Sequence, residues 1–197
     1  MSEPSRPSAG AAARERGPGG QGPLLVLVGA PASGKTTVGT GVAEILGVGF
    51  RDTDADIEDV AGTSVPDLFV RYGEPHFRAL EEQAVARALA EHEGVLALGG
   101  GAVTSAATRD LLVAHARTGR AVLWLEVDLA SAAKRVGLSR DRPILGINPR
   151  AMLRQMLEER AALYRRVATH TVFTGGREPG DVIADVAAVV YPARNSR

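Results

Sequence analysis

Hydrophobic residues in this chain gather into short apolar runs, with longer mixed segments between them. The runs at 24–28, 95–98 and 121–127 are almost wholly apolar and end beside glycine or aspartate. Such runs are typical of parallel strands that are buried on both faces of a sheet. Two weaker segments, at 48–51 and 171–173, complete the pattern. The sequence therefore predicts five strands.

Between these runs, apolar residues recur every three or four positions, which is the spacing of amphipathic helices. Ser64, followed by Asp67, predicts a helix start of the capping-box type, and Pro75 suits the first turn of a further helix. Strands alternate with helices, which predicts an α/β fold with a mostly parallel sheet whose ligands bind beyond the carboxyl ends of the strands. The predicted helices span 34–46, 57–61, a segment from Ser64, 75–92, 109–116, 128–136, 150–165 and 179–190.

Composition narrows the class of protein further. Basic and acidic residues number 23 each, so no net charge points to a nucleic acid or an anionic membrane as partner. The chain has no cysteine, which excludes disulfides and thiolate metal sites and agrees with a reducing cytoplasm. No apolar run approaches the roughly 20 residues that cross a bilayer. We expect a cytoplasmic protein that binds neither nucleic acid nor membrane.

The two ends of the chain differ from the rest in composition. Residues 1–22 are rich in Gly, Pro, Ser, Ala and Arg and lack the apolar stretch of a secretory signal. Such a segment buries too little apolar surface to order itself, so we expect a disordered N-terminal tail. We expect a single folded domain over residues 23–192 and a disordered end over 193–197.

The segment Gly29-Ala30-Pro31-Ala32-Ser33-Gly34-Lys35-Thr36 matches G-x-x-x-x-G-K-[ST] and lies between a predicted strand and a predicted helix. That context is typical of a phosphate-binding loop, in which backbone N–H groups and the helix N-terminus surround the phosphates. The lysine of such a loop reaches the β- and γ-phosphates, and the hydroxyl that follows it ligates Mg²⁺. We expect ATP to contact Ala32, Ser33, Gly34, Lys35, Thr36 and Thr37.

Two acidic residues, Asp52 and Asp54, follow the second predicted strand. In an extended chain, residues two apart face the same way, so we expect both carboxylates to point into the cleft above the loop. One carboxylate can hold Mg²⁺ through water, while the other orients or accepts a hydroxyl proton. A solvated acidic turn is the alternative interpretation.

Arginines and glycines elsewhere in the chain suggest an anion site. Arg78 begins the long helix, Arg160 lies in the second-last helix, and Gly99-Gly100-Gly101 follows the third strand. Two guanidinium groups and a cradle of backbone N–H groups suit a carboxylate, although each arginine alone is more typical of a surface. The polar stretch 137–149 carries Arg140 and Arg142 and predicts a lid over ATP, with a plain exposed loop as the alternative.

Taken together, these segments resemble the shikimate kinases, within the nucleoside-monophosphate-kinase-like P-loop proteins. The resemblance rests on GAPASGKTTVG, DTD with Ile57-Glu58, Phe77-Arg78 with Glu81, LGGGAV, Arg142-Pro143 and Leu163-Tyr164-Arg165. It implies a three-layer α/β/α fold with a five-stranded parallel sheet in the order 2-3-1-4-5, and a monomer. It also implies transfer of the ATP γ-phosphate to the 3-hydroxyl of shikimate. From the residues alone, a gluconate-type kinase, a nucleoside monophosphate kinase and a nucleotide switch stay open.

The resemblance also implies roles for individual residues. Asp54, Arg78 and Arg160 would contact shikimate together with the glycines 99–101, and Asp54 would be the catalytic carboxylate. Thr36 would bind Mg²⁺ directly and Asp52 would bind it through water. Charge on the phosphates would be stabilised by Lys35 and Arg142, and the adenine or ribose would lie near Arg135 and Arg177. Gly41, in the helix after the loop, departs from the family pattern and should cost about 1 kcal/mol of helix propensity.

Overall fold

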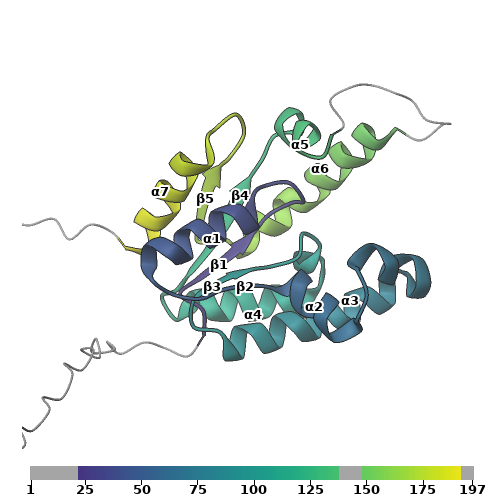
Figure 1. Ribbon diagram of the computed structural model, residues 1–197, viewed down its shortest axis with the longest axis horizontal. Helices are drawn as coiled ribbons and strands as arrows, with labels where there is room; N and C mark the ends of the chain where they lie inside the picture. Colours follow the sequence, from purple (N-terminus) through teal and green to yellow (C-terminus); the bar gives the residue numbers. More distant parts are fainter. Residues whose placement is uncertain (1–21, 138–147, 192–197) are drawn as a thin grey trace, which may run out of the picture.

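The computed structural model describes residues 22–137 and 148–191. Its centre is a five-stranded, wholly parallel sheet in the order β2-β3-β1-β4-β5 (Figure 1). The order confirms the predicted topology, and each predicted strand is present with ends that differ by at most two residues. The strands are β1 (Leu25–Val28), β2 (Phe50–Asp52), β3 (Val95–Ala97), β4 (Ala121–Glu126) and β5 (His170–Phe173).

Helices cover both faces of the sheet and make the three predicted layers (Figure 1). One face carries α1 and α7, while α3, α4 and α6 pack on the other. The helices are α1 (Lys35–Leu46), α2 (Thr53–Ala61), α3 (Val65–Glu91), α4 (Ala106–Arg117), α5 (Leu129–Arg135), α6 (Pro149–Val167) and α7 (Pro179–Val190), with a short 3₁₀ turn, η1 (Ala102–Thr104).

The core reflects the alternation of side chains along the central strands. Leu25 and Leu27 of β1 point to the face covered by α1 and α7. Val26 and Val28 point to the opposite face, where they meet α3, α4 and α6. Because successive side chains of a strand leave opposite faces, a strand covered on both sides must be apolar throughout. This explains why the run at 24–28 has no polar position.

Helices α2 and α3 build a small lobe at one end of the molecule, with a core of its own (Figure 1). Gly73 interrupts α3 with φ 78° and ψ 168°, so α3 consists of two helical segments joined by a kink. Ser64 caps the first segment by accepting a hydrogen bond from the N–H of Asp67 at 3.3 Å. Pro75 lies in the first turn of the second segment. Both predicted helix starts are therefore confirmed.

Gly41 has a different role from the one the sequence suggested. A Cβ atom at this position would lie 2.5 Å from Cδ1 of Ile183, on α7. The glycine lets α1 and α7 approach closely across the face of the sheet. Its cost in helix propensity is therefore offset by packing.

In the described part of the chain, no helix is both long and apolar enough to span a membrane.

Candidate active site

The loop between β1 and α1 lies at the carboxyl edge of the sheet. Gly34 caps α1 with φ 95°, a conformation that side chains disfavour, and Ala32 also has a positive φ, of 63°. A non-glycine residue held there indicates a backbone shaped for a ligand. The first turn of α1 leaves its N–H groups without helical partners, so they face outward as donors. The N–H groups of Lys35, Thr36 and Thr37 are therefore available to an anion at this loop.

Two side-chain features of this loop bear on its charge. Nζ of Lys35 donates to the carbonyl oxygens of Gly29 at 2.9 Å and Ala30 at 3.1 Å. Burial lowers the pKa of Lys35, against the attraction of the carboxylates of Asp54 and Asp52. The hydroxyl of Ser33 is buried and has no partner among the described residues, so Ser33 faces the interior of the loop.

Asp52 and Asp54 do lie beside the loop, but the predicted extended backbone between them is wrong. Helix α2 begins at Thr53, earlier than the expected residue 57, and Asp52 is its N-cap. Oδ1 of Asp52 accepts the N–H of Asp54 at 3.1 Å, and its Oδ2 accepts the hydroxyl of Thr36 at 3.0 Å. The short polar side chain of Asp52 favours this cap over the extended continuation that we expected.

The Thr36–Asp52 pair fits a magnesium ion. Both are hard oxygen donors, which Mg²⁺ prefers, and Mg²⁺ keeps several waters and phosphate oxygens as ligands. Such an ion needs only one or two protein groups. Within residues 22–137 and 148–191, no cluster of three or more His, Cys, Asp or Glu side chains could hold a metal ion.

Asp54 lies on the first turn of α2, directly over the glycine segment after β3. A Cβ atom on Gly99 would lie 2.5 Å from both Oδ1 of Asp54 and Oε1 of Glu81, so two carboxylates crowd this glycine. Burial raises the pKa of Asp54, and Asp52 adds to this effect while Lys35 opposes it. A partly desolvated carboxylate with a raised pKa is better suited to accept a proton than a solvated aspartate.

Arg78 is held beside the same glycines. It forms ion pairs with Glu81, which is buried, and with Glu74 at 3.1 Å. Its guanidinium also lies over the rings of Phe69 at 5.8 Å and Phe77 at 5.3 Å. Burial raises the pKa of Glu81, with Arg78 opposing the effect. These contacts fix the direction of the Arg78 guanidinium.

The three glycines present backbone groups to this cluster. The N–H of Gly99 donates to Oγ1 of Thr53 at 3.0 Å, which joins β3 to the start of α2. The N–H groups of Gly100 and Gly101 have no acceptor in the part of the chain that the structure describes. On the other side, Nη1 of Arg160 donates to the carbonyl oxygen of Gly100 at 3.1 Å. Arg78, Arg160 and two free N–H groups therefore all lie along the same three-glycine segment.

Comparison with known proteins identifies the family. The family model described as "Shikimate kinase" matches residues 31–191. A shikimate kinase from Salinispora arenicola is 52% identical over 168 residues, which cover 85% of this chain and 98% of that protein. The chain belongs to the shikimate kinase family. A family member from Frankia casuarinae is 54% identical over 169 residues, 86% of this chain and 73% of that protein.

A solved structure of this family shares the fold. Shikimate kinase from Acinetobacter baumannii in complex with shikimate superimposes with a TM-score of 0.77 at 32% identity. The match covers 89% of this chain and 96% of that chain. The family assignment and the fold predicted from the P-loop, FRxxE and LGGGAV segments are thus confirmed.

Two residues of the cluster were not among the predicted site residues of this family member. Glu81 is three residues after Arg78 on α3, a spacing that brings helical side chains together, so the pair was open to prediction. Tyr164 donates its hydroxyl hydrogen to the carbonyl oxygen of Gly100 at 2.6 Å. No local pattern relates Tyr164 to residue 100, because the contact joins α6 to the segment after β3.

The arginines expected near the nucleotide differ in their surroundings. Arg135 donates to the carbonyl oxygens of Ala32 at 3.0 Å and Thr174 at 2.6 Å, so it joins the phosphate loop to the end of β5. Arg177 lies farther along the same edge and pairs with Asp185 of α7 at 2.8 Å. Arg142 and residues 138–147 of the predicted lid lie outside the described residues.

Proposed function

We propose that this chain transfers the γ-phosphate of ATP to the 3-hydroxyl of shikimate, giving shikimate 3-phosphate and ADP. One observation carries the proposal beyond family membership. A carboxylate, two arginines and a pair of free backbone N–H groups lie along one glycine segment next to a phosphate-binding loop. That arrangement suits an acceptor that carries both a carboxylate and a ring of hydroxyl groups. The reaction belongs to the synthesis of chorismate and the aromatic amino acids.

The acceptor side of the site has two tasks in this proposal. Arg78 and Arg160, with the N–H groups of Gly100 and Gly101, bind the shikimate carboxylate, since guanidinium and backbone donors match its oxygens. Asp54 accepts a hydrogen bond from the attacking hydroxyl and takes its proton as the new oxygen–phosphorus bond forms. The bond from the γ-phosphorus to the bridging oxygen of ADP breaks in the same step. Phosphoryl transfer depends mainly on such positioning.

The nucleotide side of the site neutralises negative charge on the ATP phosphates. Lys35 and the N–H groups of residues 32–37 bind the phosphates, and we propose that Arg142 adds a positive charge near the γ-phosphate. Thr36 would hold Mg²⁺ directly and Asp52 would hold it through water, and the ion would offset charge on the phosphate oxygens. Arg135, beside Ala32, and Arg177 at the end of β5 would lie near the ribose or adenine. We further propose that the protein acts as a cytoplasmic monomer.

A direct assay tests this function. The purified full chain is supplied with ATP and Mg²⁺ and offered shikimate, gluconate or a nucleoside monophosphate in separate reactions, and ADP release is measured. We expect release with shikimate alone. ADP release with gluconate but not with shikimate would move the protein to the gluconate-type kinases, and release without any acceptor would make it a nucleotide hydrolase.

A further inference from the structure

The carbonyl oxygen of Gly100 accepts two hydrogen bonds from α6. The hydroxyl of Tyr164 donates at 2.6 Å, and Nη1 of Arg160, one helical turn earlier, donates at 3.1 Å. The proposed reaction gives Arg160 a contact with the acceptor but gives Tyr164 none. The proposed reaction therefore does not explain why a buried tyrosine is hydrogen-bonded to a glycine of the site.

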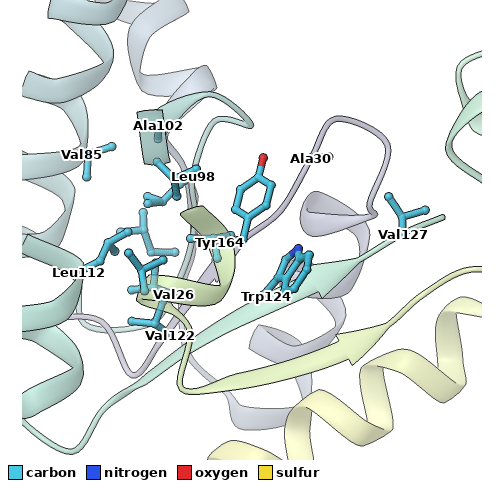
Figure 2. Packing of buried hydrophobic residues seen from close by; sticks show 14 of the residues in the cluster. Val26, Ala30, Val85, Leu98, Ala102, Leu112, Val122, Trp124, Val127 and Tyr164 are labelled. Atoms are coloured by element: carbon cyan, nitrogen blue, oxygen red, sulfur yellow. The ribbon is translucent and has the colours of Figure 1, made fainter. Parts of the chain in front are cut away.

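Tyr164 is held rigidly. Its side chain is fully buried, and its ring stacks on Trp124 of β4 with centroids 5.8 Å apart. Figure 2 shows the two rings side by side and the Tyr164 hydroxyl directed away from Val26 and Val122 in the apolar core. Burial raises the pKa of Tyr164 to about 12, so the hydroxyl keeps its proton and remains a donor at physiological pH. The hydroxyl is thus a fixed anchor for the Gly100 carbonyl.

This anchor determines where the next N–H group points. The Gly100–Gly101 peptide is planar and trans, so its C=O and N–H point in opposite directions. With the carbonyl held against α6, the free N–H of Gly101 points away from α6. Gly100 also lies close to the phosphate loop, where a Cβ atom on it would be 2.7 Å from Cδ of Pro31, which leaves little room for movement in that direction. If the hydroxyl were lost, the remaining freedom of the peptide would be rotation of its plane.

We propose that Tyr164 is a positioning residue for the carboxylate of the acceptor. Through the Gly100 carbonyl it fixes the direction of the Gly101 N–H. The hydroxyl of Tyr164 and the guanidinium of Arg160 both donate to this one carbonyl oxygen. Tyr164 does not touch the acceptor itself. This inference rests on the proposed function, because it assigns the binding of one group of shikimate.

Steady-state kinetics of Tyr164→Phe test the proposal. This substitution keeps the ring stack on Trp124 and removes only the hydroxyl. We expect the KM for shikimate to rise about tenfold, in line with one lost hydrogen bond. We expect kcat and the KM for ATP to stay within about twofold of wild type, since the phosphate loop keeps its contacts. For the methyl ester of shikimate, which lacks the anionic carboxylate, the effect of the substitution should nearly vanish.

Thr118→Val is the matched control. Its hydroxyl also donates to a backbone carbonyl, that of His115 at 2.7 Å, but at the opposite edge of the sheet. This variant should lose a similar amount of stability with no change in either KM. The proposal is overturned if Tyr164→Phe leaves the KM for shikimate unchanged, affects acid and ester equally, or fails to fold even at 10 °C. A wild-type chain that is inactive with shikimate would instead overturn the proposed function.

Discussion

Replacing Gly101 with alanine tests the arrangement of the acceptor site most directly. Gly101 has φ −97° and ψ −10°, values that alanine adopts without strain, so the backbone itself tolerates the change. The added Cβ, however, would lie 2.0 Å from Nη1 and 2.4 Å from Cζ of Arg78. The effect of Gly101→Ala is therefore confined to the position of one guanidinium.

The size of the effect follows from that distance. Restoring an ordinary contact of about 3.5 Å requires the guanidinium to move by roughly 1.5 Å. A displacement of about 1 Å in a positioned group can reduce rate or binding about 100-fold. We therefore expect kcat/KM for shikimate to fall about 100-fold, equivalent to about 2.7 kcal/mol. The fold should also lose some stability, because the displaced guanidinium pairs with the buried carboxylate of Glu81.

The assay is ADP release at varied shikimate, with thermal unfolding measured on the same samples. Gly180→Ala is the control, because a Cβ at Gly180, in the first turn of α7, would meet nothing within 4 Å. The double variant Arg78→Ala/Gly101→Ala should be no worse than Arg78→Ala alone, since both changes remove the same contact. A folded Gly101→Ala protein with the wild-type KM for shikimate would refute the reasoning.

Two further predictions concern charge and packing. Asp54→Asn should lower kcat at least about 100-fold. Because burial raises the folded-state pKa of Asp54, its charge destabilises the fold at neutral pH, and stability recovers as pH falls through that pKa. Asp54→Asn should therefore raise the Tm at pH 7, and its Tm should increase less than that of wild type as the pH is lowered. A Tm below that of wild type at pH 7 would contradict this account. Gly41→Ala gains about 1 kcal/mol of helix propensity but crowds three atoms of Ile183 within 3.4 Å. It should lower the Tm in the wild type and raise it in Ile183→Ala, and the same sign in both backgrounds would refute the packing argument.

Much of the fold could be predicted because its signals are local. The apolar strands, the capped helix at Ser64 and the G-x-x-x-x-G-K-T loop depend on residues a few positions apart, and the structure has each in place. The start of α2 was predicted too late because Asp52 has two local options. It can continue a strand or cap a helix, and its bonds to Thr36 and to the N–H of Asp54 select the cap.

The site was only partly open to prediction. Arg78 and Arg160 were selected as a set, but their directions depend on Glu81, on two phenylalanine rings and on the Gly100 carbonyl. Glu81 is one helical turn from Arg78 and was open to prediction, whereas the contacts with Phe69 and with the Gly100 carbonyl are set by packing of the finished fold. Gly41 illustrates the same limit, since its close contact with Ile183 joins two helices that are far apart in sequence.

The sequence by itself determined the order of strands and helices and the phosphate-binding loop. It also carried the motifs of the shikimate kinase family. Such features depend on backbone periodicity and on short-range hydrogen bonds, so residues close together in the sequence are enough to encode them. The tertiary structure decided that Asp54 and Glu81 both lie against Gly99, and that Tyr164 reaches Gly100. Burial and hydrogen bonding across the sheet exist only after distant segments have packed together, so no local pattern could contain them.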